Sequence, residues 1–272
     1  MGDSAKRVLF VNSEIFPYLP ESDISRIGRY LPQGIQERKK EIRSFMPRYG
    51  CINERKNQLH EVIRLSGMNI IINDVDRPLV IKVASISAAR MQVYFIDNED
   101  YFHRKQIYRD ENGNFFEDNG ERAIFFARGV LETVKKLRWA PDIIHCHGWI
   151  SHILPLYLKK SYKDDPIFAE SRIVLSLYND IRDERFPDNL KERIAAGNIH
   201  ADDISLPEHP TGIDVAELAA RYSDGIIMGS PDVDDRLRDF CAKSGKPVLE
   251  YNDAAVNDGS YIDDYDRFYS LV

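Results

Sequence analysis

Short apolar runs that alternate with amphipathic helical stretches constrain this chain more than any other feature. Runs bounded by polar residues are typical of strands buried on both faces of a parallel sheet. They are RVLFVN (7–12), QVYFID (92–97), DIIHCHG (142–148), RIVLSLYN (172–179) and GIIMGS (225–230). Helical stretches separate them, the clearest over residues 121–137. The sequence therefore predicts an α/β fold with a single Rossmann-like, doubly wound and mostly parallel sheet.

Residues 60–86 differ from this pattern, because β-rich runs there are separated by Ser-Gly and Asp-Arg-Pro turn signals. They predict an antiparallel insertion at the edge of the sheet. Further helices are expected at 25–36, 149–160, 214–221 and 231–245, with a short closing helix at 261–272. Ser230 and Pro231 suit the N-cap and first position of the helix at 231–245. We expect one domain over residues 1–272.

The composition argues against several classes of function. Asp and Glu outnumber Lys and Arg by 44 to 37, and nucleic-acid binding generally requires a basic surface instead. No stretch approaches the roughly 18 apolar residues of a membrane helix. The N-terminal apolar run is too short for a signal peptide, and three scattered cysteines give no disulfide framework. We expect a soluble, cytoplasmic protein with no nucleic-acid or membrane partner.

Candidate site residues follow from the rule that open α/β sheets bind ligands at the carboxyl ends of their strands. These candidates are Ser13, Glu14, Arg48, Tyr49, His145 to Trp149, Tyr178 to Asp180 and Ser230. A nicotinamide cofactor is disfavoured, because no Gly-x-Gly-x-x-Gly follows the first strand, and a Walker loop is also absent from the sequence. We expect no cofactor.

The segment HCHGW is the sharpest cluster of chemistry-bearing residues. His145 and His147 share one face of a strand, with His152 a few residues further on. They could ligate zinc, but a metal site needs a third convergent ligand. The other interpretations are a histidine packed in the core and a histidine that contacts a ligand. Asp232 and Asp234 could clamp a metal-bound diphosphate, yet they suit a helix N-terminus better. We expect no metal site.

The loop after the first strand has an unusual composition for a nucleotide-binding scaffold. A phosphate would sit there on tight glycines at a helix N-terminus. The sequence offers Pro20, Glu21, Ser22 and Asp23 instead. Carboxylates repel a diphosphate, so this loop is not expected to bind phosphate.

Several stretches together resemble a known family. They are VLFVNSEIFPY, MPRYG, VYFIDNEDYF, IYRDENGNFFEDNGERAIFFARGVLETVKKLRWAPDIIHCHGW, LPLYLK and RYSDGIIMGSP. These stretches, from about Arg7 to Ser230, resemble the N-terminal catalytic domain of bacterial glycogen synthase and plant starch synthase. The resemblance implies two Rossmann-like domains facing across a cleft, the first holding the acceptor glucan. It also implies metal-free, retaining transfer of glucose from ADP-glucose or UDP-glucose to an α-1,4-glucan.

The chain departs from that family's pattern in its first loop. The family has Lys-Thr-Gly-Gly-Leu there, so its phosphate-binding lysine falls on Pro20 and its glycines on Ser22 and Asp23. An acid two residues after the leucine becomes Arg26.

Two further departures concern later strand ends. The acid of the family's His-x-His-Asp-Trp becomes Gly148, and the histidine of its His-Asn pair becomes Tyr178, whereas Asn179 is kept. Since the chain ends at Val272, we also expect the nucleotide-sugar-binding second domain to be absent.

These departures predict a non-catalytic relative that binds a glycan, a small ligand or a protein at the remnant of the cleft. The residues expected to line it are Ser13, Glu14, His145, His147, Trp149, Tyr178 and Asn179. Trp149 could stack on a sugar ring. One alternative is a glucosyltransferase whose other half is supplied in trans, with Arg26 or Arg29 replacing the lost lysine. Another is a structural or regulatory partner in an oligomer.

Overall fold

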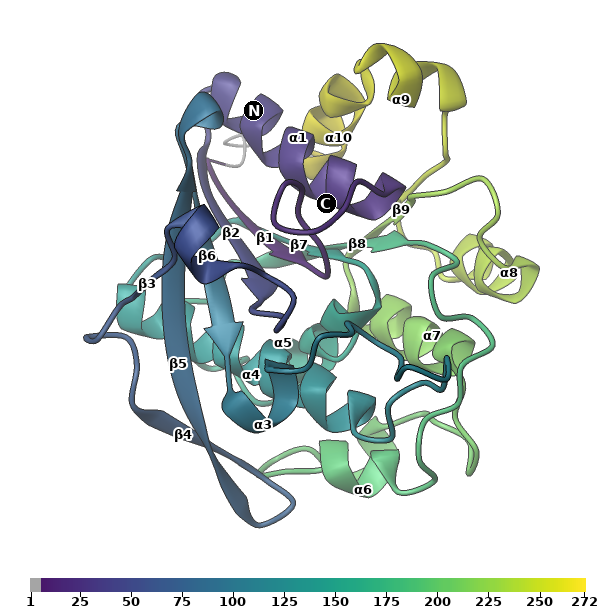
Figure 1. The fold of residues 1–272 in the computed structure, drawn as a ribbon. Helices are drawn as coiled ribbons and strands as arrows, with labels where there is room; N and C mark the ends of the chain where they lie inside the picture. Colours follow the sequence, from purple (N-terminus) through teal and green to yellow (C-terminus); the bar gives the residue numbers. More distant parts are fainter. Residues whose placement is uncertain (1–5) are drawn as a thin grey trace.

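The computed structural model describes residues 6–272, in which ten strands form one sheet in the order β10-β9-β8-β7-β1-β2-β6-β5-β3, with β4 paired to β5 (Figure 1). The strands are β1 (Arg7–Asn12), β2 (Glu41–Pro47), β3 (His60–Glu61), β4 (Met68–Ile72), β5 (Val75–Ile86), β6 (Met91–Asp97), β7 (Ile143–His147), β8 (Arg172–Leu177), β9 (Gly225–Met228) and β10 (Val248–Leu249). The helices are α1 (Asp23–Glu37), α2 (Glu54–Asn57), α3 (Glu99–Phe102), α4 (Asn119–Leu137), α5 (Leu154–Lys160), α6 (Leu190–Ile194), α7 (Gly212–Tyr222), α8 (Asp235–Lys243), α9 (Asp253–Asp258) and α10 (Tyr261–Tyr269). Within the same residues, none of the helices has both the length and the apolar character needed to cross a membrane.

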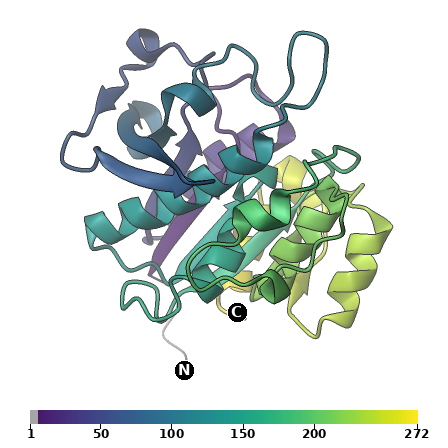
Figure 2. The same cartoon turned by 90° about the horizontal axis from the view of Figure 1, so that it is seen from below.

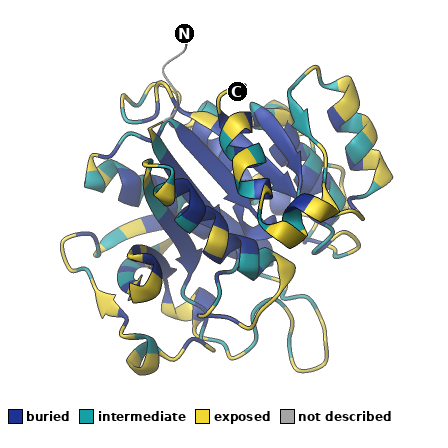
Figure 3. Cartoon of the chain, turned by 90° about the horizontal axis from the view of Figure 1, so that it is seen from above, coloured by how far each residue is buried: buried dark blue, intermediate teal, exposed yellow. Residues whose placement is uncertain are grey.

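Helices cover both faces of the sheet. In Figure 1, α1, α9 and α10 lie on one side of the strands, and Figure 2 shows α4, α5 and α7 crossing the other side. Strand β1 illustrates the cause: Leu9 and Val11 join one hydrophobic core, whereas Val8 and Phe10 join the other. Figure 3 shows the buried sheet beneath helices with exposed outer faces. The predicted doubly wound α/β fold is confirmed.

The insertion at the edge of the sheet is also confirmed, but the predicted Asp-Arg-Pro turn is wrong, because residues 76–78 pair with β4 inside strand β5. Strand β5 runs antiparallel to β6, and β4 forms a hairpin with β5. Asn73 and Asp74, which join β4 to β5, have φ values of 52° and 58°. Positive φ at both central residues is the geometry of a type I′ hairpin turn, and Asn and Asp tolerate it better than most residues.

Two expected helices differ from the structure. The segment 149–160 divides into a 3-10 turn, Trp149–Ser151, and helix α5, because Pro155 lacks an N–H and suits only the first turn of a helix. The prediction that Ser230 caps the next helix is wrong. Its hydroxyl donates to Asp232 Oδ1 at 2.6 Å, and Asp234 caps α8 by accepting from the Arg236 N–H at 2.9 Å.

The closing helix α10 packs directly over the end of β7. The Tyr269 hydroxyl and His145 Nδ1 lie 2.8 Å apart, and His145 Nε2 lies 2.7 Å from Ser176 Oγ. His147 Nε2 lies 2.8 Å from the hydroxyl of Tyr178. Both histidines are fully buried. They therefore belong to the core beneath the strand ends, which was one of the interpretations left open by the sequence.

Burial lowers the pKa of these histidines. The pKa of His145 falls well below its usual value, and those of His147 and His152 fall to about 3. His152 is buried, and neither ring nitrogen has a hydrogen-bond partner among residues 6–272. The unfolded chain binds these protons near pH 6.5 and the folded chain does not. The contribution of the neutral histidines to the free energy of unfolding is therefore fully present above that pH. It is lost as the pH falls toward 3.

We predict that His152→Leu reduces the loss of stability between pH 7 and pH 5 by about 2 kcal/mol, since a neutral buried imidazole contributes about 1.4 kcal/mol per pH unit. Urea unfolding of both proteins at the two pH values measures the difference. His60→Gln, on the exposed strand β3, is the control and should behave like the parent. Equal pH dependence in His152→Leu and the parent would contradict the assignment.

Candidate functional site

The carboxyl ends of the central strands meet through a set of short contacts. The Ser13 N–H donates to the His147 carbonyl at 2.8 Å, and the Ile150 N–H donates to Ser13 Oγ at 3.3 Å. The Tyr49 hydroxyl donates to the Ser13 carbonyl at 3.0 Å. Arg48, the neighbouring candidate, instead forms an ion pair with Glu54. Ser13 therefore holds the ends of β1, β2 and β7 together from a buried position.

The first loop closes the N-terminus of α1 with its own side chains. Ser22 is the N-cap: its Oγ accepts from the Ser25 N–H at 3.1 Å, and Ser25 Oγ accepts from the Ser22 N–H at 2.8 Å. Ser25 Oγ also donates to the Pro20 carbonyl at 3.0 Å. This capping box satisfies two of the four N–H groups at the start of the helix, those of Ser22 and Ser25.

The charge around this loop is acidic. Glu21 and Asp23 are exposed beside the cap, and the Ser22 hydroxyl donates to Glu14 Oε2 at 3.0 Å. Arg26, the half-buried cation of the first turn, lies 3.6 Å from Asp23 (Nη2 to Oδ1). Arg29 is almost buried and donates to Gln33. The cations considered as replacements for the lost lysine are therefore already engaged with their own helix.

Glu14 also connects the first strand to a distant loop. The Tyr108 hydroxyl donates to Glu14 Oε1 at 3.0 Å, across 94 residues of sequence. The burial of Asp180 and its proximity to Glu14 raise the pKa of the Asp180 carboxyl to about 6. Glu14, Tyr108, Asn179 and Asp180 are all half-buried. We call these four residues the mouth.

Tyr108 was not among the sequence candidates, because it follows no strand. The loop that follows it contains an Asx turn, in which Asp110 Oδ1 accepts from the Asn112 and Asn114 N–H groups at 2.8 and 2.9 Å. Arg122, in the first turn of the helix that comes next, is completely buried. The one signal in the sequence that could have pointed to Tyr108 was the long stretch that resembles the glycogen and starch synthase family, which includes IYRDENG.

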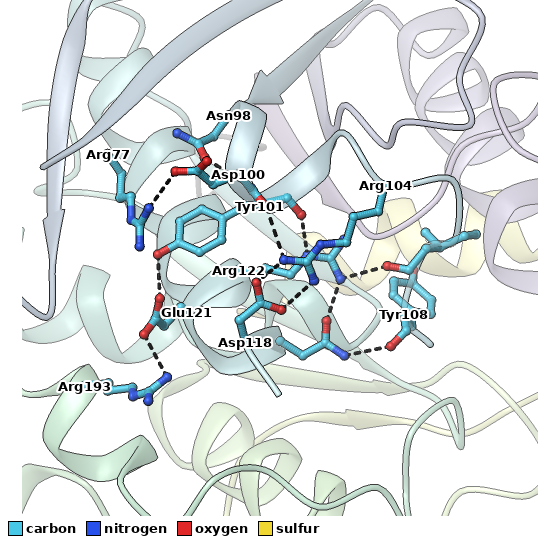
Figure 4. A network of polar contacts seen from close by, with 12 residues as sticks. Arg77, Asn98, Asp100, Tyr101, Arg104, Tyr108, Asp118, Glu121, Arg122 and Arg193 are labelled. Atoms are coloured by element: carbon cyan, nitrogen blue, oxygen red, sulfur yellow. Dashed lines mark hydrogen bonds and ion pairs between the residues drawn. The ribbon is translucent and has the colours of Figure 1, made fainter. Parts of the chain in front are cut away.

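Arg122 holds the loop that carries Tyr108 (Figure 4). Its guanidinium donates to the Tyr101 and Ile107 carbonyls, both at 2.8 Å, and to Asn119 Oδ1 at 2.5 Å. Asn119 in turn donates from Nδ2 to the Tyr108 carbonyl at 2.9 Å. One buried cation from α4 thus fixes both the backbone before Tyr108 and, through Asn119, Tyr108 itself.

Trp149 does not face the mouth. Its side chain is fully buried, with its ring centroid 5.1 Å from that of Tyr108, 5.5 Å from Phe115 and 6.1 Å from Phe186. A sugar ring cannot reach the indole face without displacing these rings. His145, His147 and Tyr178 are likewise buried, so Glu14 and Asn179 are the expected lining residues that remain partly accessible, whereas Ser13 acts from below.

Gly148 occupies the turn where the family's pattern has an acid. Its φ is +83°, a value that favours glycine, and an added Cβ would lie 2.3 Å from Ser13 Oγ. The carboxylate that meets this turn comes from Asp180, whose Oδ2 accepts from the Trp149 N–H at 3.0 Å. Gly148 carries no acid, but the Asp180 carboxylate, from the end of β8, contacts the same turn.

Two other acids near the strand ends, Asp232 and Asp234, contact residues that follow β8. Asn179 Nδ2 lies 3.4 Å from Asp232 Oδ2, and Arg182 Nη1 lies 3.8 Å from Asp234 Oδ2. In the part of the chain that the structure describes, no group of three or more His, Cys, Asp or Glu side chains is arranged to hold a metal ion. The mouth therefore presents two carboxylates, one phenol and one amide, all of which can hydrogen-bond to the hydroxyl groups of a ligand.

We predict that Arg122→Met lowers the free energy of unfolding by about 3–5 kcal/mol, because buried carbonyls lose a charged donor. It should also accelerate amide hydrogen exchange in residues 103–118. Arg138→Met, just after the same helix and exposed, is the matched control and should change neither quantity. Slow exchange in the loop of a folded Arg122→Met protein would contradict this positioning role.

Comparison with known proteins agrees with the resemblance in the sequence. Residues 7–245 match the model of a family described as the starch synthase catalytic domain. The glycogen synthase of Chlorobium limicola is 36% identical over 236 residues, covering 83% of this chain and 48% of that protein. The glycogen synthase of Chlorobaculum tepidum is 37% identical over 182 residues, covering 66% of this chain and 37% of that protein.

A solved structure shows the same fold. The catalytic domain of starch synthase IV from Arabidopsis thaliana, bound to ADP and acarbose, superposes with a TM-score of 0.71 at 14% identity. The match covers 91% of this chain and 51% of that one. The chain spans about half the length of curated relatives that it matches. The family match and the identity with glycogen synthases together show that this chain belongs to the starch synthase catalytic domain family.

Proposed function

We propose that this protein is a non-catalytic member of its family and that it binds the end of an α-1,4-glucan at the mouth. The observation that carries the proposal is the closed N-terminus of α1, where Ser22 and Ser25 cap each other and Ser22 is bonded to Glu14. A nucleotide-sugar diphosphate would meet a capped helix end beside the carboxylates of Glu14, Glu21 and Asp23, and Arg26 of the first turn already lies 3.6 Å from Asp23.

The energetics at this loop disfavour catalysis. A charge-assisted hydrogen bond from the family's lysine is worth about 1.5–3 kcal/mol, and Pro20 cannot supply it. The exposed carboxylates of Glu21 and Asp23 add repulsion toward a diphosphate. Removing one preorganised stabiliser of developing charge typically lowers a rate about 100- to 1000-fold. Arg26, the cation of the first turn, is paired with Asp23 and so does little to offset this repulsion.

The mouth suits a neutral, hydroxyl-rich ligand better. Carboxylates accept hydrogen bonds from sugar hydroxyls, whereas the Tyr108 hydroxyl and the Asn179 amide can both donate and accept. All four side chains are partly accessible, and Tyr108 is fixed through Asn119 and the buried Arg122. Preorganised polar groups bind with a smaller loss of conformational entropy. The α-glucan is proposed because the family's curated relatives are named glycogen synthases.

We predict that maltoheptaose binds and that Glu14→Gln and Tyr108→Phe each weaken binding about five- to ten-fold, since each loses one polar contact. Isothermal titration calorimetry measures the affinity. Glu61→Gln, on the exposed edge strand β3, is the matched control and should bind like the parent. No heat at millimolar maltoheptaose would remove the glucan-binding proposal.

The competing function is glucosyl transfer with the other half of the cleft supplied by another chain. Incubating the same protein with ADP-glucose and glycogen, alone and with cell extract, separates the two. We expect no protein-dependent incorporation of glucose. Incorporation that Arg26→Ala abolishes would contradict the non-catalytic proposal and identify Arg26 as the replacement cation.

A further inference from the structure

A cavity lies outside the mouth, between the loop before α4 and the segment that leads into α6. Its volume is about 740 Å³, which falls within the range of roughly 300–1,000 Å³ typical of ligand pockets. Phe115 and Asp118 come from the first segment, and Arg185, Asp188 and Arg193 come from the second. None of them belongs to the mouth, so this cavity has not yet been given a role.

The apolar part of the cavity is aromatic. The rings of Phe115 and Phe186 meet edge to face, with centroids 5.4 Å apart at 87°. Phe186 is buried, whereas Phe115 is partly exposed and can offer its ring to a ligand. Both rings rest on Trp149. An aromatic ring supported in this way can pack against the C–H face of a sugar.

The charged walls of the cavity are held from behind (Figure 4). Asp118 forms an ion pair with Arg104, and Arg193 Nη1 lies 2.7 Å from Glu121 Oε1. Glu121 Oε2 in turn accepts from the Tyr101 hydroxyl at 2.7 Å. Arg193 Nε is buried without a hydrogen-bond partner among residues 6–272. These walls are therefore held in place by their own contacts before a ligand binds.

The rim of the cavity carries both signs of charge. Arg185, Asp188 and Asn189 are exposed, and no ion pair joins Arg185 to another residue in the range 6–272. The lining also includes Glu117, so acidic and basic groups both face the cavity. A neutral ligand with many hydroxyl groups can use donors and acceptors alike.

We propose that this cavity is a second carbohydrate site, which binds an internal segment of a neutral oligosaccharide against Phe115. Arg185 and Asn189 are its accessible hydrogen-bonding groups. The identification of the oligosaccharide as an α-1,4-glucan rests on the proposed function, but the site itself rests on its own aromatic and polar lining. A chain whose end occupies the mouth and a chain held at this cavity are separate binding events.

Trp149 provides a reporter inside the protein. Its indole contacts Phe115 and Phe186 at the cavity as well as Tyr108 at the mouth. The other tryptophan, Trp139, lies elsewhere with Arg43 5.1 Å from its ring centroid. In a ¹⁵N spectrum the indole N–H signal of Trp149 should therefore move on binding, and that of Trp139 should stay in place.

The test titrates maltoheptaose into the full chain and follows both indole signals together with calorimetry. Arg185→Gln and Asn189→Ala are the cavity variants, and both positions are exposed, so folding should be retained. Arg64→Gln, at an exposed arginine on the edge insertion, is the matched control. We expect each cavity variant to weaken binding about three- to ten-fold, with the control unchanged.

Comparison with the mouth variant Tyr108→Phe separates the two proposals. If Arg185→Gln and Asn189→Ala bind like the parent while Tyr108→Phe binds more weakly, the cavity proposal is wrong and the mouth proposal stands. If the cavity variants weaken binding and Tyr108→Phe does not, the cavity proposal is supported and the mouth proposal is wrong. If the parent protein does not bind maltoheptaose, both are wrong.

Discussion

The hydrogen bonds between Ser22, Ser25 and Glu14 determine what this scaffold can do. A helix N-terminus at the carboxyl edge of a parallel sheet attracts anions, because its first N–H groups are unpaired. Here the chain satisfies two of those groups itself, the Ser22 and Ser25 N–H groups, and then adds the Glu14 carboxylate to the outer side of the cap. The fold of a nucleotide-sugar enzyme is retained, but its most favourable position for a phosphate is occupied.

The same carboxylate links the cap to the rest of the edge. Glu14 accepts from Ser22 with one oxygen and from Tyr108 with the other, and Tyr108 is held by Asn119 and Arg122 on α4. Trp149 lies beneath this chain of contacts and separates two groups of partly accessible polar residues. Binding of neutral carbohydrate follows from this arrangement more readily than chemistry at a diphosphate does. This arrangement is the basis for our proposal that the protein binds the polymer that its relatives are named for, without extending it.

Sequence patterns were sufficient to predict the sheet, but they could not predict which side chains form the candidate site. The run Val8–Val11 is apolar at every position, so burial on both faces could be predicted. The hairpin was predicted from Asp-Arg-Pro, but its turn lies at Asn73 and Asp74. Local chemistry could not choose between Ser230 and Asp234 as a cap, since both residue types favour that position. The burial of Trp149 depends on Phe115 and Phe186, which the fold brings from distant segments. Tyr108 reaches Glu14 across 94 residues, and no local pattern encodes that contact.

The backbone amide signals of Ser25 and Arg26, followed by NMR while ADP is added, test the central claim most directly. A closed N-terminus predicts that neither signal moves at millimolar ADP, because their N–H groups already donate to Ser22 Oγ and to the Ser22 carbonyl. Saturable movement of both signals, abolished by the same salt concentrations that screen a phosphate contact, would show that the helix still receives an anion and would contradict the account.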